Sequence, residues 1–148
     1  MSDKMITTDH PLSGSQQEIL IGLLDVIIPA SDDGRMPSAG EIDIMAYIET
    51  HAPEFVAALI PGLDSLGAAF AALPQAGRVP LVEAFSLEQA GLFGTLLFHV
   101  YACYYQENRV LEGLGIGAGA PFPRGNTVIP GDLSLLDPVL KRPRLYRT

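Results

Sequence analysis

The chain has a single cysteine, no tryptophan and few charged residues for its length. Because Cys103 is alone, an internal disulfide and any Cys-x-x-Cys metal or haem motif are excluded. Charged residues make up 18% of the 148 residues and hydrophobic residues 48%, whereas about 25% charged residues are usual in soluble domains. Either the core is unusually large for this length, or a partner covers part of the surface; the C-terminal part favours the second explanation.

Basic residues are also scarce in most of the chain. Residues 1–120 carry 15 acidic and four basic side chains, whereas residues 121–148 carry two acidic and five basic ones, and the net charge is −8. An acidic body would repel phosphate groups, so the composition argues against nucleic acid as the main partner.

The N-terminus lacks the features of an export signal. Residues 1–10 hold no basic region, no apolar run and no twin arginine, which predicts a cytoplasmic protein. Residues 1–14 are expected to form a flexible arm.

The longest apolar run, Ala90 to Tyr105, organises the predicted fold. Ser86 and Gln89 have capping-box spacing, which predicts a helix from Ser86 to about residue 112. Apolar residues fall on every face of it, so we expect this helix to be buried on all sides at the centre of the domain. The run is shorter than the roughly 20 residues of a membrane span and contains His99, so no span is expected.

Four further segments show helical periodicity or helix-end signals. They are residues 16–28, capped by Ser13 or Ser15; 38–51, capped by Ser38 with Glu41; 53–73, kinked or split at Pro61 and Gly62; and 79–85. No segment alternates as a strand does. The predicted fold class is therefore all-α, with a bundle of about five helices in residues 15–112 around the buried central helix.

Residues 113–148 differ from the bundle because glycine and proline recur throughout them. Asp132 is placed to cap a short turn over residues 133–136 that Pro138 closes, and the rest is expected to be a long irregular C-terminal tail of the same domain. The tail keeps apolar residues such as Phe122, Leu136 and Tyr146. A segment of this composition gains free energy by lying across a surface, either its own bundle or another protein.

The glycines of residues 113–119 do not meet the requirements of a nucleotide-binding loop. That fingerprint needs a preceding strand and a following helix, whereas here a helix precedes and Pro121 follows. A flexible exit from the helix, with Gly113 or Gly115 at the C-cap, is the expected structure.

No catalytic, cofactor-binding or metal-binding set is evident in the sequence. The histidines, His10, His51 and His99, are far apart and share no ligand spacing with a carboxylate or with Cys103. We expect His99 to be a core histidine bonded to a carbonyl, His51 to lie near a helix C-terminus, and Cys103 to be a small core residue. An enzyme would need Asp25, Asp32 or His51 to converge in one pocket, but Asp32 and Asp33 are typical of a solvated turn.

Several stretches carry a resemblance to a known family. They are residues 104–111, 121–125 and 131–139 at the C-terminal end, and residues 24–30 followed by 36–40 near the start. Together they resemble the gluconate 2-dehydrogenase subunit 3 family over about residues 15 to 147, and the C-terminal block is the more specific part.

The resemblance implies a small helical subunit with no cofactor of its own. Its partner would be a large FAD-dependent dehydrogenase of the glucose-methanol-choline type, which oxidises a sugar, sugar acid or glycoside and passes electrons to a cytochrome or other acceptor. The small subunit would support folding, stability and sometimes export of that flavoprotein. Many relatives carry a twin-arginine signal, which this sequence lacks, so a cytoplasmic complex is expected and a periplasmic one is the alternative.

The expected partner contacts lie at the end of the central helix and in the tail. The apolar anchors are Tyr104, Tyr105, Phe122, Pro123, Leu136 and Tyr146, and Arg124 and Arg147 are expected to pair with acidic groups of the flavoprotein. The cluster of Tyr101, Tyr104 and Tyr105 suits a core edge and an interface equally well. A stand-alone helical module that binds a small apolar ligand, with the tail folded onto its own core, is the alternative.

Overall fold

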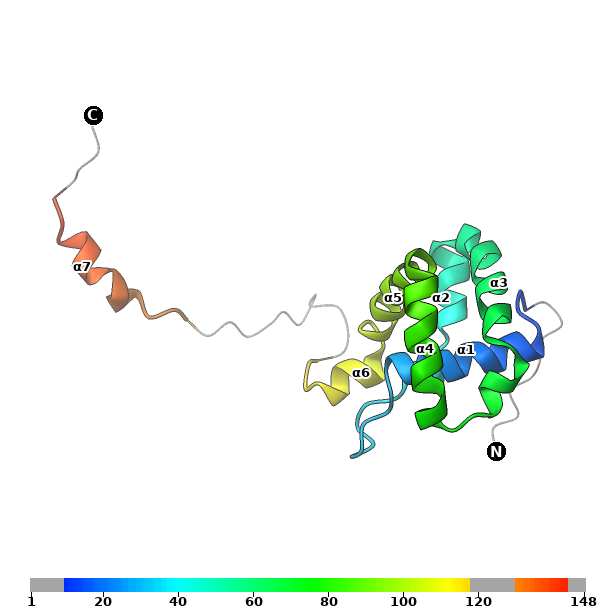
Figure 1. Ribbon diagram of the computed structural model, residues 1–148. Coiled ribbons are helices and arrows are strands. Elements are labelled where there is room, and N and C mark those ends of the chain that lie inside the picture. The colour runs from blue at the N-terminus through cyan, green and yellow to red at the C-terminus, as the bar shows by residue number, and fades with distance from the viewer. Residues whose placement is uncertain (1–9, 118–129, 144–148) are drawn as a thin grey trace. The chain divides into compact units, whose positions relative to one another are not determined.

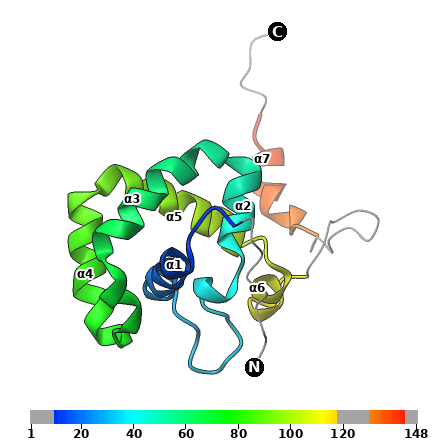
Figure 2. The same ribbon diagram turned by 90° about the vertical axis from the view of Figure 1, so that its right-hand side faces the viewer.

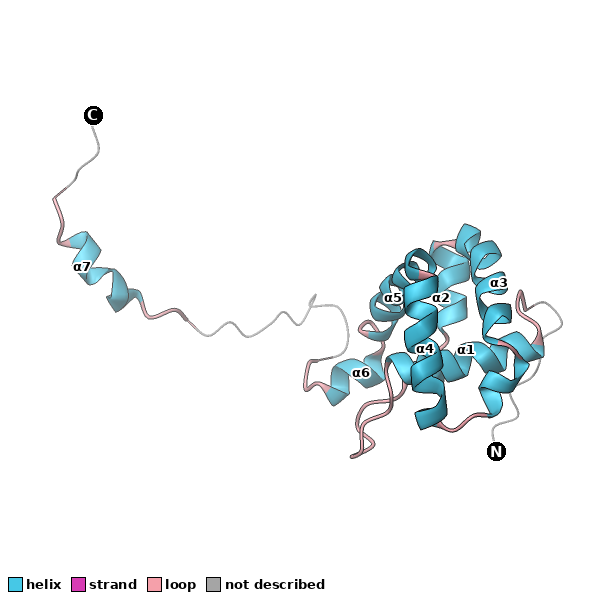
Figure 3. Cartoon of the chain, in the orientation of Figure 1, coloured by secondary structure: helices cyan, strands magenta, loops and turns pink. Residues whose placement is uncertain are grey.

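The computed structural model describes residues 10–117 and 130–143 (Figure 1). The chain separates into two compact units, Met1–Ala118 and Gly119–Thr148, and each is considered by itself. Throughout the described ranges the regular structure is helical and no strand is present (Figure 3). The predicted all-α fold class is therefore confirmed.

The described part of the first unit contains six α-helices and three short 3-10 segments. They are α1 (Gly14–Ile27), η1 (Ala39–Glu41), α2 (Ile44–His51), η2 (Pro53–Phe55), α3 (Val56–Leu66), η3 (Ala68–Ala72), α4 (Gln75–Glu88), α5 (Ala90–Tyr104) and α6 (Asn108–Gly113). Helix α1 is viewed nearly end-on in Figure 2, between α4 and α2. It contacts η1, η3, α3 and α4, and its residues Leu20, Leu23 and Leu24 are buried in the core.

Helix α1 begins at the cap that the sequence predicts. The Ser13 hydroxyl accepts a hydrogen bond from the Gln16 backbone N–H at 3.3 Å, and the Gln16 side chain accepts one from the Ser13 N–H at 3.0 Å. This reciprocal pair satisfies two N–H groups that a helix start leaves without partners. The helix ends at Ile27, just before Pro29.

The helix predicted over residues 38–51 is interrupted. Glu41 makes the predicted capping-box hydrogen bond, since its Oε1 accepts from the Ser38 N–H at 3.0 Å. Only the single turn of η1 follows, however, and α2 starts anew at Ile44, where Asp43 Oδ1 accepts from the Ala46 N–H at 3.1 Å. Two capping side chains so close together produce two short elements instead of one helix.

Of the kink or split predicted at Pro61 and Gly62, the split does not occur, because α3 continues through both residues. The chain breaks instead at Gly67, whose φ of 79° lies in the left-handed region that favours glycine. Gly62 has a packing role, since a Cβ there would collide with the side chain of Leu92 on α5.

The predicted helix start at Ser86 is also wrong. Helix α4 runs to Glu88, and the Ser86 hydroxyl donates to the Glu83 carbonyl at 2.7 Å within the last turns of that helix. The chain then bends by 114° into α5, which starts at Ala90. No single described helix is long and apolar enough to cross a membrane, and α4 with α5 meets that test only as a bent pair.

Helix α5 is not buried on all sides, contrary to the expectation. Leu96, Val100 and Tyr104 are almost fully buried against the bundle, whereas Phe98 is 67%, Tyr105 50% and Tyr101 45% exposed. In the described bundle α5 packs mainly against α2, α3 and α4, so one apolar side of it is left uncovered.

The exit from α6 has the predicted glycine cap. Gly115 has a φ of 73°, and the Ile116 N–H donates to the Leu111 carbonyl at 2.8 Å. This is the hydrogen-bond pattern by which a left-handed glycine ends a helix.

The described part of the second unit, residues 130–143, contains η4 (Leu133–Leu136) and α7 (Asp137–Leu140). The predicted Asp132 cap is confirmed, since its Oδ1 accepts from the Ser134 N–H at 3.0 Å and from the Ser134 hydroxyl at 2.6 Å. Pro138 does not close the turn as expected. It lies in the first turn of α7, where a missing N–H costs nothing.

Candidate interaction surface

The structure separates the predicted anchor residues into three groups. Tyr104 lies in the core, 1% exposed, and its hydroxyl donates to the Pro37 carbonyl at 2.7 Å. Direct contact of Tyr104 with a partner would require that core to open. Tyr105 is 50% and Leu136 51% exposed, so both are accessible. The other five predicted contacts lie outside the described residues: Phe122, Pro123, Arg124, Tyr146 and Arg147.

Considered by itself, the described part of the tail unit is apolar and exposed. We call its five large apolar side chains the tail cluster: Leu133, Leu135, Leu136, Val139 and Leu140, each between 51% and 77% exposed. Lys141 and Arg142 follow the cluster directly. Two short helical turns are too small to form a core, so the cluster needs another surface to leave water.

A second exposed apolar feature, of which the sequence indicated only Tyr101 and Tyr105, lies on α5. We call it the α5 stripe: Gly91, Gly94, Phe98, Tyr101 and Tyr105. These residues recur at alternating intervals of three and four, so they share one face of the helix. All five are exposed in the bundle. The apolar run showed no preferred face, but the glycine spacing within it was a usable signal.

The charge of the bundle is almost entirely acidic. Residues 10–117 contain 13 acidic and three basic side chains, and all three arginines are engaged within the unit. Arg35 donates to the Gly113 carbonyl and Arg78 to the Ala71 carbonyl, and Arg109 pairs with Glu41 at 3.0 Å. The bundle therefore presents carboxylates with few local counter-charges.

Glu41 joins the two segments that carry the family resemblance. Its Oε1 accepts from the Ser38 N–H, and its Oε2 pairs with Arg109 of α6. The Ser38 hydrogen bond, and then the Arg109 side chain, hold the pKa of Glu41 below its ordinary value of 4.5. The charged form of Glu41 thus stabilises the contact between η1 and α6.

We expect Glu41→Gln to be less stable than the parent at pH 7, with the difference vanishing in acid. Because the folded-state pKa is lowered, the contribution is complete above the unfolded pKa and is lost as the pH falls through the folded one. The side chain of Glu41 is 45% exposed, so the effect at pH 7 should not exceed about 1 kcal/mol. Urea unfolding of both proteins between pH 7 and pH 3 measures it, and a difference that persists at pH 3 would contradict this origin.

The buried titratable groups do not form a catalytic set. His99 is 9% exposed and packs between Phe55 and Phe98, each with its ring centroid at 5.4 Å. Its Nδ1 has no hydrogen-bond partner, so this atom does not make the expected bond to a carbonyl. Burial, followed by the charges of Glu107 and Asp43, raises the pKa of the Cys103 thiol and disfavours a nucleophilic thiolate.

The acidic residues and His51 that an enzyme would need are not brought together. Asp25 lines a groove with Glu18 and Arg78, while Asp32 lies in an exposed turn. His51 is the last residue of α2, as expected, and stacks on Tyr47 with ring centroids 4.1 Å apart. Within residues 10–117 and 130–143 no three His, Cys, Asp or Glu side chains are placed to hold a metal ion.

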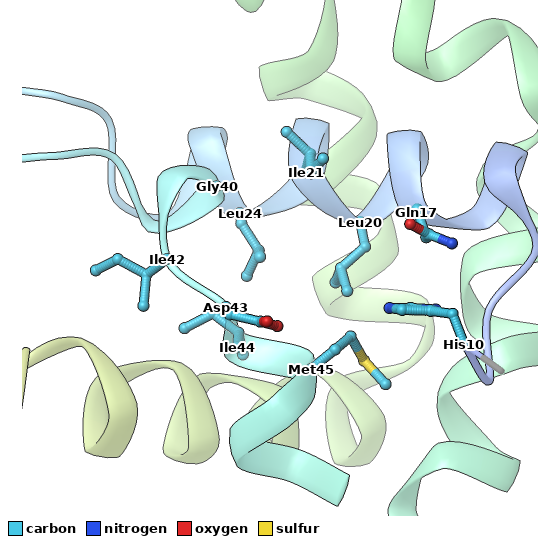
Figure 4. Close-up of a pocket in the computed structure, with 10 residues that line it drawn as sticks. All are labelled: His10, Gln17, Leu20, Ile21, Leu24, Gly40, Ile42, Asp43, Ile44 and Met45. Atoms are coloured by element: carbon cyan, nitrogen blue, oxygen red, sulfur yellow. The ribbon is translucent and has the colours of Figure 1, made fainter. Parts of the chain in front are cut away.

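The pocket between α1 and the start of α2 is small (Figure 4). His10, Gln17 and Met45 are among its lining residues, and its volume is about 50 Å³. This volume accommodates a few water molecules, whereas pockets for small organic ligands usually measure about 300–1,000 Å³. The groove at Asp25 and Arg78, about 410 Å³, is larger but open, and its lining mixes three charged side chains with isoleucine, glycine and alanine.

The described residues thus define a class of protein: an acidic helical bundle with exposed apolar surfaces. No family model, curated protein or solved structure matches the chain. The resemblance to gluconate 2-dehydrogenase subunit 3 stays a prediction that rests on the residues named for it.

Proposed function

We propose that this chain is a non-catalytic small subunit of an FAD-dependent sugar, sugar-acid or glycoside dehydrogenase complex. It binds and stabilises the large flavoprotein, which carries the FAD and passes electrons to a cytochrome or other acceptor. The chain itself holds no cofactor. The observation that supports this proposal best is the tail cluster, in which five large apolar side chains are at least half exposed.

The energetics of the tail cluster favour its burial on a surface, which this proposal assigns to a protein partner. Fully burying one Leu or Val side chain contributes about 1.5–3 kcal/mol. Burial of all five on one partner therefore offsets a substantial part of the cost of association and of ordering the tail. Lys141 and Arg142, next to the cluster, suit acidic groups at the rim of the same partner surface.

The alternative, a module that binds a small apolar ligand, has less support. It needs an enclosed apolar cavity, whereas the pocket in Figure 4 holds about 50 Å³ and the groove at Arg78 is open, with three charged side chains in its lining. The resemblance at residues 104–111 and 131–139 adds weight to the subunit proposal, since it implies a flavoprotein partner and no catalytic residues in this chain.

Co-expression with a glucose-methanol-choline type flavoprotein from the same genome tests the proposal. We expect the two polypeptides to co-elute in size-exclusion chromatography and the flavoprotein to lose solubility or thermal stability when it is expressed alone. A chain that is soluble and monomeric on its own and shows no affinity for the flavoprotein would contradict the proposal, as would the absence of such a gene from the source genome.

A further inference from the structure

The α5 stripe is shaped to receive another helix. From Gly91 to Tyr105 it spans about 21 Å at 1.5 Å per residue. Helix α5 contains no charged residue between Ala90 and Tyr104. A Cβ added at Gly91 or at Gly94 would meet no atom within 4 Å, so the first half of the stripe is open backbone. The second half carries the exposed rings of Phe98, Tyr101 and Tyr105.

The polar groups along the open half are already satisfied. Thr95, next to the stripe, donates its hydroxyl to the Gly91 carbonyl at 3.0 Å. Its methyl group is then the part available for packing. A neighbouring helix therefore meets glycine backbone and a methyl group without desolvating an unpaired hydroxyl, and glycines allow the axes to approach closely.

Charge disfavours a second copy of this chain on the stripe. In an antiparallel pair centred on Phe98, Tyr105 of each copy would lie opposite Gly91 of the other. The same pairing would bring Glu88, just before α5, close to Glu107, just after it, at both ends. Arg109, the nearest arginine to Glu107 along the chain, is already paired with Glu41, so these like charges would have few counter-ions.

We infer that the α5 stripe docks an apolar helix of the flavoprotein partner, flanked at both ends by lysine or arginine. The apolar middle of that helix covers Phe98, and its basic ends face Glu88 and Glu107. This inference rests on the proposed function and adds a second contact surface, on a different unit from the tail cluster.

Site-specific photo-crosslinking in the co-expressed full-length chain tests it. A benzoylphenylalanine replaces Phe98 on the stripe, Leu136 in the tail cluster, or Glu54, which is exposed on η2, as the control. We expect the Phe98 and Leu136 positions, but not Glu54, to crosslink to the flavoprotein, with the Phe98 adduct mapping to an apolar helix with basic ends. Crosslinking at Leu136 alone would overturn this inference and leave the proposed function standing, whereas crosslinking at neither position would overturn both.

The molecule that is crosslinked to position 98 shows which segment occupies the α5 stripe. An adduct with a second copy, or one that closes within the same chain, would overturn the inference. A Phe98 adduct with a flavoprotein segment that lacks flanking basic residues would overturn its charge argument.

A glycine substitution separates docking from folding. Gly94→Gln fills the open part of the stripe while replacing glycine by a better helix former, so we expect Tm to rise by a few degrees and affinity for the flavoprotein to fall at least tenfold. Gly14→Gln on α1, where a Cβ also meets nothing within 4 Å, is the matched control and should leave affinity unchanged. Unchanged affinity of Gly94→Gln in a titration would contradict docking at the stripe.

Discussion

Replacing Tyr104 with alanine is expected to lower the free energy of unfolding by about 3–5 kcal/mol, the usual cost of deleting a buried aromatic ring. Tyr104 is 1% exposed and joins the end of α5 to the loop before η1 through its hydrogen bond to the Pro37 carbonyl. The substitution removes the ring and leaves that carbonyl without its partner. Urea unfolding followed by circular dichroism measures the loss.

Tyr104→Phe isolates the hydroxyl from the ring. The ring contacts stay, so only the hydrogen bond at 2.7 Å is lost, at a cost of about 1–3 kcal/mol for a buried acceptor left unpaired. Burial raises the pKa of Tyr104, which keeps its hydroxyl protonated as a donor at neutral pH. If Tyr104→Phe were as stable as the parent, the Pro37 contact would contribute nothing, and Tyr104 would be held by packing alone.

The sequence predicts well those helix ends that are fixed by residues only a few positions away along the chain. Ser13 with Gln16 starts α1, Asp132 caps η4, and Gly115 is the left-handed residue that ends α6. Each signal acts within one turn of backbone, so no distant residue is needed to decide it.

Some local patterns fit either a helix end or a continuing helix, and in these cases tertiary contacts decide which one forms. Ser86 with Gln89 has the spacing of a cap, but α4 continues past it because Phe85 packs in the core and the bend follows at Gln89. Pro61 does not stop α3, whereas Gly67 does. Local propensity is a weak prior where the packing of a whole helix decides its length.

The exposed side of α5 was only partly predictable, because it too depends on contacts with distant residues. Every face of the run from Ala90 to Tyr105 is apolar, so the sequence alone did not show which side would be left uncovered. Tyr104 and Tyr105 are adjacent and chemically identical, yet one is buried and the other is half exposed. Their assignment depends on the position of the Pro37 loop, which is 67 residues away along the chain.

Removing the apolar side chains of the tail should abolish the complex without unfolding the bundle. The triple substitution Leu135→Ser, Leu136→Ser and Leu140→Ser deletes three of the five members of the tail cluster. If each contributes like a typical interface anchor, about 2 kcal/mol, the three together contribute about 6 kcal/mol and the dissociation constant rises about 10⁴-fold. These residues belong to a different unit from the core residues of the bundle, so the Tm of the bundle should not change.

The control for this triple substitution is Leu81→Ser. Leu81 is 42% exposed on α4 and belongs to neither the tail cluster nor the α5 stripe, so this variant should retain affinity. Calorimetric titration of each variant with the purified flavoprotein gives the dissociation constants, and thermal unfolding monitored by circular dichroism gives Tm. A triple variant that binds as tightly as the parent would remove the main support for the subunit proposal, because the cluster would then be exposed without a partner to cover it.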